Sequence, residues 1–115
     1  MIDLGLVVDE RDGWVVVSVS GELDMATAPD LRERLHALIA DGQANIVIDL
    51  DAVGFLDSTA LGVLVGAMKR ARSAGGDVRL VCTQSRIAKV LEITRLDQAF
   101  ATFVTVDAAV APNGV

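Results

Sequence analysis

The residues with the clearest potential for chemistry are Asp57, Ser58 and Thr59, a carboxylate followed by two hydroxyls. They come where an apolar, β-branched segment gives way to a segment with helical periodicity. A hydroxyl in the first turn of a helix can accept a hydrogen bond from a free backbone N–H. The same N–H groups, with the positive end of the helix dipole, can stabilise a phosphate added to that hydroxyl. The pattern therefore allows two interpretations of Ser58, a simple helix cap or a phosphorylation site.

A phosphate on Ser58 would place about −1.5 to −2 charges in a segment that is already acidic. Such a charge would repel an acidic or apolar partner surface, and its bulk would obstruct close packing. A loss of about 3 kcal/mol weakens binding on the order of 100-fold, which is enough for a switch. The carboxylates that we expect near this hydroxyl are Glu22, Asp24, Asp49, Asp51 and Asp57.

The other groups with catalytic or metal-binding potential stand apart. His36 is the only histidine, and no second metal ligand is near it in the sequence, so a position at the solvent edge of a helix is predicted. A hydrolase built on Ser58 would need glycines where Leu56 and Ala60 stand. Cys82 lies in a predicted strand and reads as a small buried residue. We expect no enzymatic activity, no catalytic residue, no cofactor and no metal.

The chain has 115 residues, of which 52% are hydrophobic and 23% charged, as in a folded globular domain. We expect one domain over residues 1–115. The formal net charge of −6 disfavours binding to nucleic acid. No apolar stretch approaches the roughly 20 residues of a membrane span, and the acidic N-terminus is unlike a secretory signal. With a single cysteine, these features favour a cytoplasmic protein without a membrane partner.

Hydrophobic periodicity divides the chain into alternating strands and helices. The predicted strands cover residues 4–9, 14–20, 45–50, 78–83 and 103–106. The predicted helices lie between an N-cap at Thr27 and a stop at Gly42, over residues 58–74 and, with Ser85 as a possible cap, over residues 85–94. The first two strands form a hairpin, and the tail from Ala108 to Val115 is expected to be frayed or a short helix.

This order predicts an α/β fold, with a mixed, mostly parallel sheet and helices packed largely on one face. Functional groups in such folds gather at the carboxyl ends of the strands. A loop predicted over residues 51–57 leads to Ser58 at that edge. Gly21 is predicted to end the second strand, and Gly62 and Gly66 are predicted to permit close helix packing.

Four segments together resemble the STAS domain of the anti-sigma factor antagonist family, the bacterial proteins that release sigma factors by partner switching. The resemblance covers nearly the whole chain. Its marks are Gly21-Glu-Leu-Asp24, Ile46-Val-Ile-Asp49, Phe55-Leu-Asp-Ser-Thr-Ala-Leu-Gly62 and Gly75-Gly76.

The resemblance implies that the unphosphorylated protein binds an anti-sigma factor that is also a serine kinase with its own ATP site, which frees the sigma factor. The kinase would then phosphorylate Ser58, the position that matches the family serine, and a serine phosphatase would restore it. Asp57 would orient the kinase encounter and Thr59 would line the contact. The expected partner-binding residues are Glu22, Asp24, Met25, Asp57, Ser58, Thr59 and Leu61.

The chain departs from the family pattern at Ala60, where glycine is usual. We expect the first helical turn to survive, because alanine is the better helix former, although its methyl group could alter the approach of a kinase. Thr59 is an alternative phosphate acceptor. The alternative function is a constitutive STAS interaction subunit of a transporter or signalling complex, without a phosphorylation switch.

Overall fold

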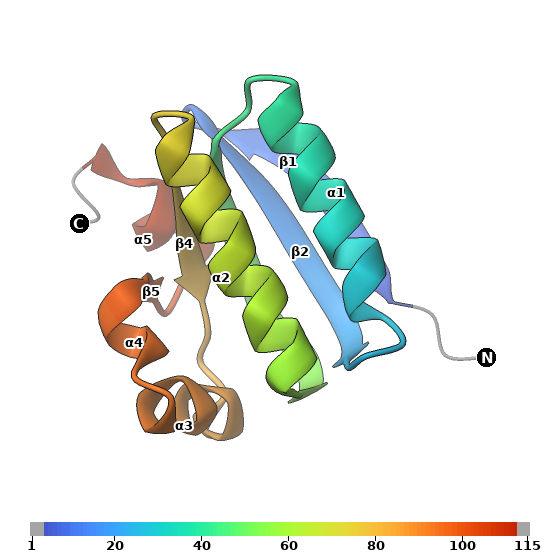
Figure 1. Ribbon diagram of the computed structural model, residues 1–115. Helices are drawn as coiled ribbons and strands as arrows, with labels where there is room; N and C mark the ends of the chain where they lie inside the picture. The colour runs from blue at the N-terminus through green and yellow to red at the C-terminus, as the bar shows by residue number, and fades with distance from the viewer. Residues whose placement is uncertain (1–3, 113–115) are drawn as a thin grey trace.

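The computed structural model describes residues 4–112, which form one five-stranded sheet with helices on both sides (Figure 1). The strands are β1 (Gly5–Arg11), β2 (Trp14–Leu23), β3 (Asn45–Leu56), β4 (Asp77–Val81) and β5 (Ala101–Phe103). The helices are α1 (Ala28–Ala40), α2 (Ser58–Ser73), α3 (Ser85–Ile93), α4 (Leu96–Ala99) and α5 (Val106–Val110).

The strands lie side by side in the order in which the chain makes them. The β1–β2 hairpin is antiparallel, and every later pair is parallel. Parallel neighbours need a crossover, and α1 and α2 supply the first two. The predicted α/β fold, with its N-terminal hairpin and mostly parallel sheet, is confirmed.

Alternate residues of the strands feed two separate apolar clusters, because successive side chains of a strand point to opposite faces. Ile46 and Ile48 of β3 belong to the larger cluster, which α1, α2 and α3 cover. Val47 between them belongs to the smaller cluster, which α5 covers on the back face of the sheet. The prediction that the helices lie largely on one face is confirmed, with α5 as the exception.

The third strand is longer than the sequence suggested. β3 continues to Leu56, so the prediction of a loop over residues 51–57 was wrong. The extension is possible because β2 runs beside it as far as Leu23. The register shifts twice along this part of the pair, and Gly21 takes a positive φ of 105° there without ending β2. A glycine adopts this conformation at little cost, so the strand bends and continues.

Several boundaries near the C-terminus also differ. β4 ends at Val81, so Cys82 lies just outside the strand, only partly buried beside the larger cluster. β5 covers Ala101–Phe103, earlier than predicted, and α4 was not predicted. α5 (Val106–Val110) is the short helix that was one expectation for the tail, although it begins two residues earlier; the rest of that prediction extends beyond the described residues. Among residues 4–112, no helix is long and apolar enough to cross a membrane.

Candidate functional site

The ends of β2 and β3 lie at the same edge of the sheet. Leu23 pairs with Leu56, and the backbone N–H of Asp57 donates to the carbonyl oxygen of Leu23 at 3.0 Å. This hydrogen bond therefore joins the carboxyl ends of β2 and β3. The segments that follow them, residues 24–27 and the first turn of α2, begin side by side.

Asp57, and not Ser58, is the N-cap of α2. Its backbone is extended, and its Oδ1 accepts the N–H of Ala60 at 3.0 Å. A carboxylate at this position also complements the positive end of the helix dipole. Ser58 is the first helical residue, and its side chain is exposed. Ser58 therefore lies beside the N-cap, and the interpretation of its hydroxyl as a simple helix cap does not apply, because Asp57 takes that role.

The second oxygen of the same carboxylate fixes the neighbouring loop. Asp57 Oδ2 accepts the backbone N–H of Met25 at 3.1 Å. Met25 itself projects into solvent, with 74% of its surface exposed. One side chain therefore joins the start of α2 to the loop between β2 and α1.

Within that loop, Thr27 is a buried polar residue with a full set of partners. Its Oγ1 donates to the carbonyl oxygen of Glu22 at 2.6 Å and accepts the N–H of Asp24 at 3.0 Å. Asp24 Oδ1 in turn accepts the N–H groups of Ala26 and Thr27. Thr27 stands at the N-cap of α1 as predicted, but its side chain closes the loop and does not cap the helix.

The predicted contact residues come from three consecutive parts of this edge: the end of β2, the loop after it, and the start of α2. Glu22, Met25, Ser58 and Thr59 are exposed, while Asp24, Asp57 and Leu61 are partly buried. We call this set, together with Phe55, the Ser58 edge. Phe55, which pairs with Glu22 and is 47% exposed, also lies at this edge but was not among the predicted residues. An aromatic residue at the end of a strand, beside a cap, was the signal that could have identified it.

Two of the carboxylates expected near Ser58 lie elsewhere. Asp51 accepts the backbone N–H and the hydroxyl of Thr83, at 2.6 and 2.9 Å. Asp49 accepts the N–H of Asp51 at 3.0 Å. Asp57 follows Asp51 by six positions along the extended chain, a span of about 20 Å. The expectation of a rim that includes Asp49 and Asp51 was therefore wrong.

Ala60 faces the interior of the protein. Its side chain is 0% exposed and belongs to the larger apolar cluster. The first turn of α2 forms with Ala60 in place, as expected, and the methyl group does not lie on the exposed surface that a kinase would approach. The prediction that Gly62 and Gly66 permit close helix packing was wrong, because a Cβ added at either position would meet nothing within 4 Å. Neither glycine is required for packing within residues 4–112.

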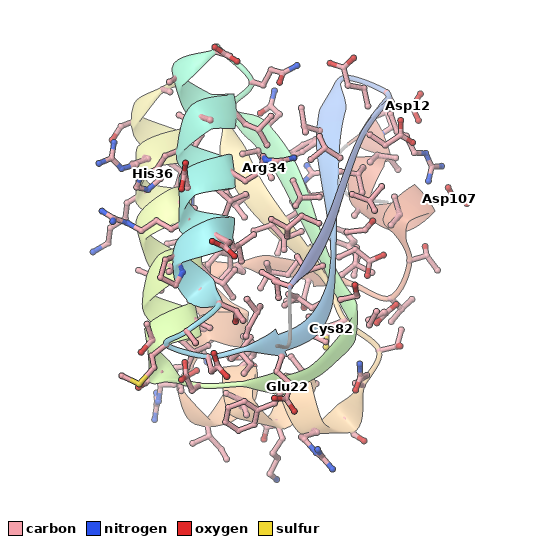
Figure 2. The ribbon with its side chains drawn as sticks, turned by 90° about the vertical axis from the view of Figure 1, so that its right-hand side faces the viewer. Asp12, Glu22, Arg34, His36, Cys82 and Asp107 are labelled. Atoms are coloured by element: carbon pink, nitrogen blue, oxygen red, sulfur yellow. The ribbon has the colours of Figure 1, made fainter. Side chains whose placement is uncertain are left out.

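The remaining candidates lie away from this edge. Glu22 lies at one end of the molecule and Asp12 at the other, while His36 lies on α1 between them (Figure 2). Burial lowers the pKa of His36, and the charges of Arg70 and Arg32 lower it further. Burial raises the pKa of the Cys82 thiol, which favours its protonated form over the reactive thiolate. Among the residues that the structure describes, no cluster of three or more metal-binding side chains occurs.

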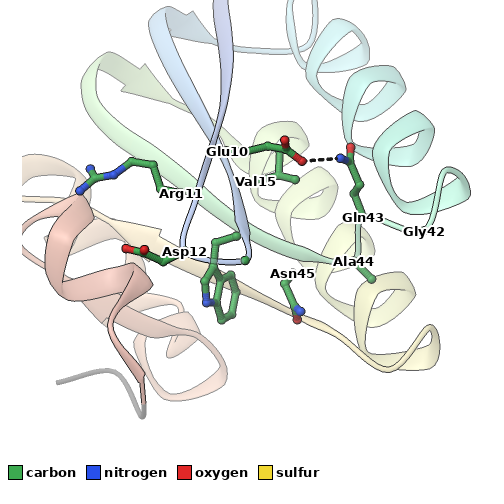
Figure 3. A pocket seen from close by; sticks show the side chains of 10 residues that line it. Glu10, Arg11, Asp12, Val15, Gly42, Gln43, Ala44 and Asn45 are labelled. Carbon is green, nitrogen blue, oxygen red and sulfur yellow. Dashed lines mark hydrogen bonds between the residues drawn. The ribbon is translucent and has the colours of Figure 1, made fainter.

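The best-defined hollow, of about 340 Å³, is also distant from Ser58. It lies between the β1–β2 turn and the segment that enters β3, where Gln43 donates to Glu10 at 2.9 Å (Figure 3). Asn45, at the amino end of β3, lines it, whereas Ser58 follows the carboxyl end of that strand. This hollow is thus separate from the Ser58 edge.

A family model described as the STAS domain matches residues 6–109. The chain is 34% identical to the anti-sigma-B factor antagonist of Staphylococcus aureus (strain NCTC 8325 / PS 47) over 95 residues, which cover 83% of this chain and 88% of the relative. The corresponding values for the anti-sigma-B factor antagonist of Bacillus subtilis (strain 168) are 35% identity, 83% and 86%. A crystal structure of an anti-sigma factor antagonist from Mycobacterium paratuberculosis superposes with a TM-score of 0.85 at 36% identity, and covers 93% of this chain and 91% of that one.

Proposed function

The chain belongs to the STAS domain family, and from this premise we propose that it acts as an anti-sigma factor antagonist. Its relatives in Staphylococcus aureus and Bacillus subtilis carry that name and match most of its length. In this role it is a binding protein, not an enzyme, and works in the cytoplasm as one domain over residues 1–115. Its partner is an anti-sigma factor, whose capture frees a sigma factor.

We propose further that the anti-sigma factor is a serine kinase and that Ser58 is its target. The observation that carries this proposal is the position of Ser58, exposed as the first residue of α2. Because Asp57 already accepts the capping bond from Ala60, the Ser58 hydroxyl is not needed for the helix. It can therefore be esterified without the loss of a structural bond. A serine phosphatase would reverse the modification.

A phosphate at Ser58 would change the electrostatics of the whole edge. It would bring about −1.5 to −2 charges next to the carboxylate of Asp57, which the loop at Met25 needs as an acceptor. A partner packed against this surface would have to desolvate the phosphate. A cost of about 3 kcal/mol would weaken binding on the order of 100-fold.

The proposed contact surface is the Ser58 edge. Met25 supplies an exposed apolar side chain on one side, and Ser58 and Thr59 supply the first turn of α2 on the other. Leu61 lies about one helical turn after Ser58, is partly buried, and would contribute an apolar side chain to the contact. Glu22 and Asp24 would set the charge of its border.

Intact mass after incubation with ATP and the candidate anti-sigma kinase tests the modification. We expect the wild-type chain to gain one phosphate and Ser58→Ala to gain none. Ser85→Ala is a matched control, because Ser85 is also an exposed first residue of a helix, α3. It should be modified as readily as the wild type. Phosphorylation of Ser58→Ala that disappears only when Thr59→Val is added would move the site to Thr59 and overturn the assignment.

Calorimetry with the same partner tests the switch. Ser58→Ala should retain the wild-type affinity, whereas Ser58→Glu should bind on the order of 100-fold more weakly. Equal affinities for the two variants would overturn charge gating. That result would favour the alternative of a constitutive STAS interaction subunit of a transporter or signalling complex.

A further inference from the structure

We propose that α5 is a C-terminal cover that opens and closes over the back face of the sheet independently of the rest of the domain, with Arg79 as its anchor. We define the cover as residues 105–111. It lies across the sheet from α1, as the positions of Asp107 and His36 show (Figure 2). This inference does not depend on the proposed function, because it concerns the face of the sheet that α1 and α2 do not cover.

The cover closes a small apolar cluster of its own. Ala109 and Val110 of α5 pack against Val16, Val47 and Val81, all of them 4% exposed or less. None of these buried residues belongs to the larger cluster beneath α1, α2 and α3. Removal of α5 from the sheet would therefore leave the larger cluster intact.

The helix cannot persist without this docking. α5 has 5 residues, far fewer than the 12–15 or so at which isolated helices become even marginally stable. Its start is capped by Thr105, whose Oγ1 accepts the N–H of Ala108 at 3.0 Å. An opened cover therefore loses its helical hydrogen bonds, and its amide protons become open to exchange with solvent.

Arg79 is the polar group that holds the end of the cover. It stands on β4 one residue before Leu80 and two before Val81, so it points to the back face with Val81. Its Nη1 donates to the carbonyl oxygen of Ala109 at 2.6 Å and to that of Ala111 at 3.4 Å. A cation at these carbonyl groups complements the negative end of the helix dipole.

Two aromatic rings hold the same guanidinium in place. The Cζ atom of Arg79 lies 4.2 Å from the ring centroid of Trp14 and 5.6 Å from that of Phe103. Stacking on rings restricts the side chain, so less freedom is lost when it binds the carbonyl oxygens. The second polar link, between Arg11 and Asp107, is exposed and contributes little. Arg79 is thus the contact whose loss should open the cover.

Opening would uncover an apolar strip on the backs of β2, β3 and β4. The strip consists of Val16, Val47 and Val81, bordered by Trp14 and Phe103. It lies on the same β2 and β3 that lead to the Ser58 edge at their carboxyl ends. The domain therefore holds a second apolar face that exists only when the cover is open.

Native-state hydrogen exchange on the full chain, measured by NMR, tests the proposal. The amide of Ala109, which donates to the carbonyl oxygen of Thr105 at 3.1 Å, reports on the cover, and the amides of α1 report on global unfolding. In the wild type, Ala109 should exchange faster than α1 and with little dependence on low denaturant concentrations. Arg79→Gln should accelerate Ala109 exchange about tenfold, as expected for loss of the short hydrogen bond to the Ala109 carbonyl oxygen, and leave α1 unchanged.

The controls separate the anchor from a general effect of charge. Arg34→Gln removes an exposed arginine from α1 and should change neither rate. Trp14 is the only tryptophan, so acrylamide quenching of its fluorescence gives a second readout, which should increase in Arg79→Gln. If that variant does not fold, Arg79→Lys, which keeps the charge and loses the planar group, should give the same pattern. Exchange of Ala109 at the α1 rate in the wild type, or equal acceleration of both in an Arg79 variant, would overturn the proposal.

Discussion

The carboxylate of Asp57 accepts the backbone N–H of Met25 at 3.1 Å across 32 positions of sequence, while its other oxygen caps α2. The loop after β2 and the first turn of α2 are thus held by one residue. This relationship makes Asp57 a structural part of the Ser58 edge as well as a charge on it.

Replacement of Asp57 should destabilise the domain. We expect Asp57→Ala to lower the free energy of unfolding by about 1–3 kcal/mol, because it removes a helix cap and leaves the Met25 N–H without its acceptor. Asp57→Asn, which keeps one acceptor oxygen, should cost less. Urea denaturation measures both. Glu33→Ala, at an exposed position of α1, is the control and should stay within about 0.5 kcal/mol of the wild type. An Asp57→Ala variant as stable as this control would contradict the assigned role.

Thr27 should matter through its hydroxyl and not through its size. Thr27→Val keeps the shape but leaves the Glu22 carbonyl and the Asp24 N–H without their partner. The expected loss of stability is about 1–3 kcal/mol. Thr102→Val, at an exposed position of β5, should be nearly neutral in the same thermal or urea melts. Equal stability of the two variants would show that the loop does not depend on this side chain.

Substitution of Ala60 by the glycine usual in the family should affect stability and leave binding unchanged. Ala60→Gly removes a fully buried methyl group and adds backbone freedom in the first turn of α2. Together these effects should cost about 1.5–2 kcal/mol. Because the methyl group is 0% exposed, affinity for the partner should not change in calorimetry. Unchanged stability with altered affinity would be the opposite of this expectation.

Gly62 offers the reverse case within the same helix. Gly62→Ala places a methyl group where nothing lies within 4 Å, so only the backbone entropy changes. The free energy of unfolding should rise by about 0.5–1 kcal/mol. Gly66→Ala, which is equally open, should behave alike. Destabilisation by either substitution in urea melts would mean that the helix packs more closely than the structure indicates.

His36 should make stability fall at mildly acidic pH. Burial and the charges of Arg70 and Arg32 hold the pKa of His36 below the value of 6.5 for a free imidazole. As the pH falls below about 6.5, the unfolded chain takes up the proton first, so stability decreases until the pH passes the folded-state pKa. His36→Gln should flatten this part of the stability curve. NMR titration of Arg70→Gln should show a higher pKa for His36, and an unchanged value would refute the assigned cause.

The types and order of the main elements could be read from the sequence. The β-branched run from Trp14 and the apolar stripe of α2 are local patterns, and local patterns determine whether a segment becomes a strand or a helix. The chain's resemblance to the STAS family was equally readable, because its motifs are contiguous. The exposure of Ser58 at the start of a helix follows from the same information.

Local patterns could not predict which distant segment each strand, cap and helix face would contact. β3 continues past Leu50 because β2 bonds to it there through two register shifts, which no feature of β3 alone reveals. Asp57 and not Ser58 is the N-cap of α2, because the backbone of Asp57 is extended. The hydrogen bond from its N–H to Leu23, at the end of the β2–β3 pair, holds Asp57 in place. The rotation of α2 then decided that Ala60 faces the core and that Gly62 faces solvent.

The sequence alone therefore determined the fold class, the family and the exposed hydroxyl at the start of α2. Only the tertiary structure decided that Asp57 accepts a hydrogen bond from Met25, that Asp51 accepts one from Thr83, and that Arg79 donates to α5. The physical reason is that propensity and periodicity act over a few residues. Hydrogen bonds and apolar contacts between distant segments depend on where the sheet brings those segments together.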